Sequence, residues 1–267
     1  MKPGKIRDII EDRLDELEDS SEKISVGFKE EDIHCFRVGV KSLRAVFRLL
    51  NVGCGYNEKI LLPHKFMALY KAAGRIRDAQ LALKYFAAIT ETYPSFGTVL
   101  QHNVEESIEE WKHIYASFAF SGLRKKIKKV HFNPLPPVSA AIFLRSGLHS
   151  VRKLSARPGV KDEEMHNIRK LIKDLILIVD FISKDWKAAK DRIKDLPVDK
   201  LEQVAATIGE YNDTRMRVDI IRQLLSASIF GEDRHKYGSI LADEEKVFEK
   251  WGELVSQQLP FLRVMYS

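Results

Sequence analysis

Five basic residues stand at helical spacing between positions 34 and 48, and they have the clearest capacity for chemistry in this sequence. They are His34, Arg37, Lys41, Arg44 and Arg48. On a helix with ~100° of turn per residue, all five lie within an arc of about 80° and a length of about 21 Å. No acidic residue occurs between positions 34 and 50. Such an acid-free stripe favours a long, repetitive anion over a single phosphate.

Apolar residues flank the stripe on both sides, whereas an ordinary surface helix has a single apolar face. Phe36 and Leu43 stand on one side, and Cys35, Val38 and Leu49 on the other. We therefore expect a helix that is packed over most of its circumference and leaves one cationic seam open. The alternative interpretation is a solvated basic face, which is the usual meaning of a run of Lys and Arg.

The composition is that of a globular protein with anionic partners. The 267 residues are 45% hydrophobic and 31% charged, and the net charge is +6. The first 22 residues carry eight acids and no apolar core segment, so we expect no signal peptide. No apolar run approaches the ~20 residues that span a bilayer. Two cysteines, Cys35 and Cys54, provide no disulfide framework, so we expect a cytoplasmic protein. We also expect no cofactor.

Helical periodicity runs through the whole chain, and few segments alternate with the period of two that is typical of strands. We predict an all-α protein with helical segments over residues 5–18, 33–50, 63–74, 81–86, 98–130, 138–157, 163–183, 199–209, 211–229 and 235–257. Ser20–Ser21, Gly209 and Pro260 are expected to end helices, and Asp32 to cap one. The strongest break is Asn133–Pro137, with three prolines, and it divides the chain into halves 1–133 and 134–267.

The two halves share a pattern of residues, which indicates an internal repeat. His34-x-x-Arg37-x-x-x-Lys41 recurs as His166-x-x-Arg169-x-x-x-Lys173, and Gly74-x-x-x-Asp78 recurs as Gly209-x-x-x-Asp213. The distance from His to Gly is 40 residues in the first half and 43 in the second. We expect two similar helical bundles related by a pseudo-twofold axis, with basic seams facing a shared cavity. Asp78 and Asp213 are expected to orient an arginine or cap a helix start.

With these paired motifs the chain resembles the CHAD domain, the conserved-histidine α-helical domain. The likeness covers nearly the whole sequence and implies two four-helix bundles with pseudo-twofold symmetry around a basic central groove. It also implies non-catalytic binding of inorganic polyphosphate along inward-facing basic residues, and some members localise to polyphosphate or polyester storage granules. Many members carry an adjoining CYTH domain, and this chain resembles a stand-alone member. It departs from the family pattern at Ile176 and Leu177, where an Arg–Tyr pair is usual, so its second stripe is shorter.

The candidate polyphosphate-binding residues form two stripes and a second rank along the cavity wall. The stripes are His34, Arg37, Lys41, Arg44 and Arg48, and His166, Arg169 and Lys173; the second rank is Arg75, Arg77, Arg124, Lys125, Arg145, His149 and Arg152. His34 and His166 either donate to phosphate oxygens or pack at a helix start.

No catalytic or metal-binding residue is predicted, and we expect no membrane partner. Two other functions compete with polyphosphate binding: a nucleic-acid-binding helical protein and a His/Asp metal-dependent phosphohydrolase. The sequence has no nucleic-acid recognition motif, no HD dipeptide, no paired carboxylates on one face and no P-loop. A scaffold role at a granule is compatible with polyphosphate binding.

Overall fold

The structure is a computed structural model that describes residues 1–53, 59–92, 94–157, 159–226 and 234–264. The described residues contain ten α-helices, one 3₁₀-helix and no strand, so the predicted all-α class is confirmed. The chain divides into two compact units, Met1–Ala140 and Ala141–Ser267. Within the described ranges, no helix has an apolar stretch long enough to cross a membrane.

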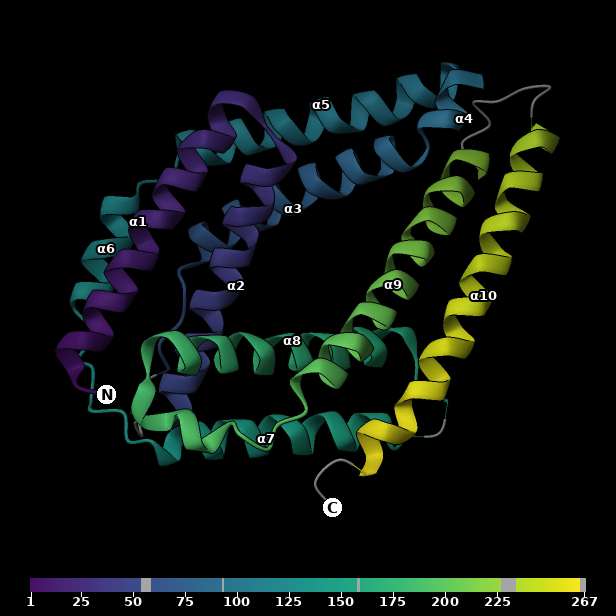
Figure 1. Ribbon diagram of the computed structural model, residues 1–267. Coiled ribbons are helices and arrows are strands. Elements are labelled where there is room, and N and C mark those ends of the chain that lie inside the picture. Colours follow the sequence, from purple (N-terminus) through teal and green to yellow (C-terminus); the bar gives the residue numbers. More distant parts are fainter. Residues whose placement is uncertain (54–58, 93, 158, 227–233, 265–267) are drawn as a thin grey trace. The chain divides into compact units, whose positions relative to one another are not determined.

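The first unit is built on the long helix that carries the N-terminal stripe. Its helices are α1 (Pro3–Gly27), α2 (Glu30–Gly53), α3 (His64–Tyr85), α4 (Ala87–Thr92), α5 (Pro94–Ala116) and α6 (Phe120–Lys128). α2 packs against both α1 and α3, and α3 packs in turn against α5 (Figure 1). α1 also contacts α6, and α4 packs on α5. α2 is therefore enclosed by neighbours on two sides, which leaves a limited seam for polar residues.

An aromatic cluster anchors α2 in this unit. The ring of Phe36 lies 5.6 Å from that of Trp111 on α5 and 6.1 Å from that of Phe66 on α3, in edge-to-face arrangements. All three side chains are fully buried. Aromatic pairs in this geometry stabilise a core by about 0.5–1.5 kcal/mol beyond the burial of their area. This packing fixes the rotation of α2 about its axis and thereby the direction in which its basic residues point.

The second unit contains the second set of paired motifs. Its helices are α7 (Val138–Ser155, which begins in the last residues of the first unit), α8 (Asp162–Asp185), the 3₁₀-helix η1 (Lys187–Arg192), α9 (Val198–Ser226) and α10 (Arg234–Val264). α8 packs against α9, and α9 and α10 run side by side (Figure 1). A largely buried ion pair joins these last two helices, with Arg217 Nε 3.0 Å from a carboxylate oxygen of Glu244.

Three expected helix breaks are wrong. The gap expected between residues 74 and 81 is absent because α3 runs through it as one helix. At the other two, side chains or packing compensate locally. α1 runs through Ser20–Ser21, whose hydroxyls donate to the carbonyls of Glu16 and Glu18 within the same helix. α9 runs through Gly209 without interruption. A glycine inside a helix costs only about 1 kcal/mol relative to alanine, which the buried residues of α9 outweigh.

Three other helix ends also differ from the prediction. The segment expected as one helix over 98–130 is divided between α5 and α6, and backbone bonds from Ser117 and Phe118 to carbonyls three residues earlier form a turn there. α10 continues past Pro260, and α2 begins at Glu30, so Asp32 lies in its first turn and does not cap it. Cys54 and the expected helix end at residue 229 lie outside the described residues.

Candidate functional site

The stripe predicted from the sequence lies on α2, which begins with three acidic residues in its first turn and continues with basic ones. Acidic residues at a helix N-terminus stabilise the helix through its dipole, so this order suits α2. Along the stripe, His34 is exposed, and Arg37, Lys41, Arg44 and Arg48 are half-buried. The seam is less enclosed at its start than expected, since Cys35 and Val38 are exposed as well.

Arg37 lies against the backbone of α3 at Gly74. Its Nη1 donates to the carbonyl oxygen of Tyr70 at 3.5 Å. A Cβ atom placed on Gly74 would lie 2.1 Å from that same nitrogen, so no other residue type fits beneath the guanidinium as it stands. The Tyr70 ring completes the contact, with its centroid 5.1 Å from Arg37 Cζ and 5.8 Å from Arg44 Cζ. Arg37 and Arg44 are thus held by an aromatic ring and a carbonyl, which leave their charge unneutralised.

The second unit repeats this contact with the corresponding residues. Arg169 on α8 donates from Nε to the carbonyl oxygen of Ala205 on α9 at 3.2 Å. A Cβ on Gly209 would lie 3.2–3.3 Å from the guanidinium nitrogens of Arg169. In both units the accepting carbonyl belongs to the residue four positions before the glycine. The sequence analysis identifies the recurrence of Arg and Gly but does not predict that they contact each other. Their joint recurrence in both halves is the signal that could have indicated this contact.

Arg77 on α3 lies close enough to the stripe on α2 to act on its electrostatics. Although the side chain of His34 is largely exposed, partial desolvation of its ring is the first cause that lowers its pKa, and the positive charges of Arg77, Lys41 and Arg37 lower it further. Arg77 comes from α3, so two helices contribute to one positive region. Further along α2, burial and the neighbouring Arg44 lower the pKa of Arg48. A cation whose pKa is lowered by neighbouring positive charge is stabilised by an anion placed beside it.

Two second-rank candidates are held by carboxylates instead. Arg75 donates to Glu110 on α5. Arg124 on α6 contacts three acids of α1, which are Glu11 at 3.0 Å, Asp15 at 2.7 Å and Glu18 at 2.6 Å. The bond to Glu18 is the largest of the effects that raise the pKa of Arg124. Because their partners are carboxylates, the charges of Arg75 and Arg124 are neutralised within the protein, and we do not include these two arginines in the binding surface.

The remaining candidates lie on three helices. Lys125 is exposed on α6; Arg145, His149 and Arg152 are exposed along one side of α7; and His166, Arg169 and Lys173 are half-buried on α8. Asp78 and Asp213 are exposed and lie inside the continuous helices α3 and α9, so neither caps a helix start. In the part of the chain that the structure describes, no three His, Cys, Asp or Glu side chains gather in a way that could hold a metal ion.

Comparison with known proteins gives one family and one fold. A model of the CHAD domain matches residues 8–222. Among solved structures, the chain is similar to the crystal structure of the CHAD domain from the plant Ricinus communis, with a TM-score of 0.73 and 12% sequence identity over 97% of this chain and 93% of that one. At this identity the likeness concerns the fold alone. A search of curated proteins found no match.

Proposed function

Because the chain belongs to the CHAD domain family, we propose that it binds inorganic polyphosphate along the stripe on α2 and does not process it as an enzyme. Family membership confirms the resemblance predicted from the paired motifs. The observation that carries the proposal is the stripe itself, in which half-buried cations follow one another along α2 with no acid among them. Arg37 and Arg44 contact the ring of Tyr70, so they are ordered without being neutralised.

The chemistry of the stripe suits a chain of phosphates. Each guanidinium offers several N–H donors in a plane and can bind phosphate oxygens in pairs, whereas Lys41 adds a point charge. His34 adds a further N–H donor, and its ring also becomes positively charged when a bound anion favours the protonated form. A polyanion that spans the stripe releases its condensed counterions, so we expect binding to weaken steeply with salt.

Titration with labelled long-chain polyphosphate tests the proposal. We expect the variant Lys41→Ala/Arg44→Ala to lose at least about tenfold in affinity and to lower the slope of log K against log salt by roughly two. This variant spares Arg37, which packs on Gly74. The matched control is Lys126→Ala/Lys128→Ala, which removes the same charge from exposed residues of α6. Equal losses in both variants would mean that net charge, and no particular site, attracts the ligand.

We further propose that the second unit contributes a matching stripe, His166, Arg169 and Lys173, and that the two stripes belong to pseudo-twofold-related bundles that face one basic groove. The repeated motifs and the repeated Arg–Gly contact support this symmetry. If one ligand bridges both stripes, Lys173→Ala should weaken long-chain polyphosphate far more than tripolyphosphate, because a long chain gains from a high effective concentration at its second site. Equal weakening of both ligands would indicate independent sites.

Two measurements separate this function from its competitors. Duplex and single-stranded DNA should displace labelled polyphosphate poorly at fixed salt; efficient displacement would favour a nucleic-acid-binding protein. Incubation of polyphosphate with Mg²⁺ or Mn²⁺ should release no phosphate; release that requires the protein would identify a phosphohydrolase. In cells we expect the protein at polyphosphate-rich granules, and fluorescence microscopy of the Lys41→Ala/Arg44→Ala variant tests whether this localisation needs the stripe.

A further inference from the structure

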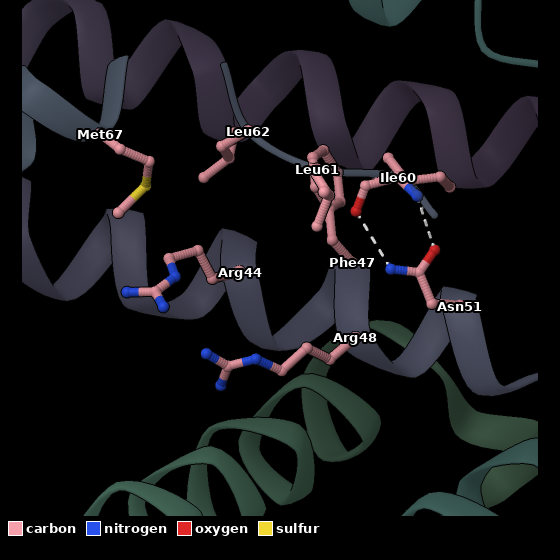
Figure 2. A pocket seen from close by; sticks show the side chains of 8 residues that line it. All are labelled: Arg44, Phe47, Arg48, Asn51, Ile60, Leu61, Leu62 and Met67. Carbon is pink, nitrogen blue, oxygen red and sulfur yellow. Dashed lines mark hydrogen bonds between the residues drawn. The ribbon is translucent and has the colours of Figure 1, made fainter. Parts of the chain in front are cut away.

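A cleft of about 300 Å³ lies at the C-terminal end of the stripe, between α2 and the segment that leads into α3 (Figure 2). Arg44 and Arg48 stand one helical turn apart on its α2 side, and Figure 2 shows their guanidinium groups pointing the same way. Facing them across the cleft are Leu61, Leu62 and Met67. This volume is at the lower end of the range in which proteins bind small molecules.

The far wall of the cleft is fixed to α2 by a pair of hydrogen bonds. Asn51 Oδ1 accepts from the backbone N–H of Ile60 at 2.8 Å, and Asn51 Nδ2 donates to the carbonyl of the same residue at 3.0 Å (Figure 2). A side-chain amide that satisfies both backbone groups of one residue holds that residue as a neighbouring strand would. The apolar wall is therefore held in place before any ligand arrives.

One side of the cleft is cationic and the other is apolar, and polyphosphate could contact only the cationic side. The α2 side carries two guanidinium groups close enough for Arg44 to lower the pKa of Arg48, and no acid lines the cleft. The opposite wall is aliphatic, and Leu61 is 75% exposed although it is a large apolar residue. Polyphosphate has no apolar surface to cover that wall, so the arrangement fits a ligand with a charged end and an apolar body.

We propose that this cleft binds a small amphipathic phosphate, a phosphate monoester whose alkyl or aryl group lies against Leu61, Leu62 and Met67. The guanidinium of Arg44 can donate a pair of bonds to separate oxygens of a phosphate, and the positive charge of Arg48 beside it favours a dianionic phosphate over a monoanionic carboxylate. The apolar wall lies inside a concave cleft, which suits a single small molecule better than a bilayer surface. This inference goes beyond polyphosphate binding and does not depend on it, although both ligands use Arg44 and Arg48.

Calorimetric titration of the full chain with octyl phosphate, below its micelle concentration, tests the proposal. We expect octyl phosphate to bind at least about tenfold more tightly than inorganic phosphate, because its alkyl group leaves water, and more tightly than octanoate or octyl glucoside. Leu61→Ser should weaken octyl phosphate by roughly three- to tenfold and leave inorganic polyphosphate unchanged. The matched control is Val26→Ser, because Val26 of α1 is 89% exposed in the same unit. Arg48→Gln should weaken both ligands.

Each contrary result identifies the part that fails. Equal affinity for octyl phosphate and inorganic phosphate would overturn the role of the apolar wall, and equal affinity for octyl glucoside would overturn that of the arginines. Binding to vesicles of anionic phospholipid, without binding of monomeric octyl phosphate, would replace the small ligand by a membrane surface. A perturbed methyl resonance of Met67 on adding octyl phosphate would place the ligand in this cleft. Octyl phosphate binding without polyphosphate binding would support this inference and refute the function proposed above.

Discussion

Replacing Gly74 by alanine is the sharpest test of how the stripe is held in position. The new Cβ would lie 2.1 Å from Arg37 Nη1 and 3.2 Å from Arg37 Cζ, and real Cβ atoms do not approach a neighbour as closely as the first of these distances. The guanidinium must therefore move by roughly 1 Å or more to restore ordinary van der Waals separation. Since Nη1 is the far end of a flexible side chain, the backbone of α3 can stay where it is.

The effects on stability should nearly cancel. Alanine in a helix interior is favoured over glycine by about 1 kcal/mol. The displaced Arg37 loses a hydrogen bond and a ring contact with Tyr70, each of about 0.5–1 kcal/mol. The free energy of unfolding should thus change by no more than about 1 kcal/mol, which for a chain of this size shifts Tm by roughly 2–4 °C at most.

The effect on binding should be larger, because the cation no longer stands where the stripe needs it. Loss of one charge-assisted contact corresponds to a decrease in polyphosphate affinity of about three- to tenfold. Anisotropy of labelled polyphosphate at fixed salt measures the affinity, and thermal unfolding followed by circular dichroism measures the stability of the same samples.

Three other glycines provide the comparison series. Gly209→Ala places its Cβ at 3.2–3.3 Å from Arg169, so a shift of a few tenths of an ångström suffices and the affinity should fall by no more than about twofold. Gly122→Ala in α6 and Gly238→Ala in α10 meet nothing within 4 Å, so they should only gain helix propensity. If Gly74→Ala binds polyphosphate as well as Gly122→Ala does, the position of Arg37 does not matter for binding and our reasoning is wrong.

Three further predictions concern titration and ion pairs. Burial and neighbouring cations lower the pKa of His34 below 6.5, and a bound polyanion raises it, so affinity should increase as the pH falls from about 8 to 6, and His34→Gln should flatten that profile in the same anisotropy assay. Arg124→Gln should destabilise the protein to urea by about 1–3 kcal/mol, because three acids of α1 lose their partner, without changing polyphosphate affinity. Arg217→Met should cost about 3–5 kcal/mol in urea unfolding, and adding Glu244→Leu should recover much of that loss, because the single variant removes the arginine that pairs with a largely buried carboxylate.

The stripe could be predicted from the sequence because helix geometry alone places residues three and four apart on one face. His34 to Arg48 do lie on one helix, and the all-α class is confirmed. The division of the chain into halves 1–133 and 134–267 and the shared groove remain predictions. The correspondence between the motifs of the two halves could also be predicted, because a repeat within one chain is visible in the sequence without knowledge of contacts.

The partners of the second-rank arginines could not be predicted in the same way. Arg124 is neutralised by acids more than a hundred positions earlier, and only the packing of α1 on α6 brings them together. The cleft beside Arg48 escaped prediction for a similar reason, since Leu61 and Leu62 of its apolar wall come from a loop that Asn51 fixes at Ile60 through side-chain hydrogen bonds. Such contacts depend on tertiary packing, which local periodicity does not encode.

The Arg–Gly contact suggests why arginine and glycine recur together in this chain. In an α-helix the Cα–Cβ bond tilts toward the N-terminus, so a side chain at position 74 would cover the carbonyl of Tyr70, four residues earlier. Glycine leaves that oxygen open, and its second lone pair can accept from Arg37 while the first serves the helix. A carboxylate could hold the guanidinium equally well but would cancel its charge, as the acids of α1 do for Arg124. A backbone carbonyl positions the cation and leaves its full charge for an anion. The same arrangement at Arg169 and Ala205 is the strongest structural similarity between the two halves.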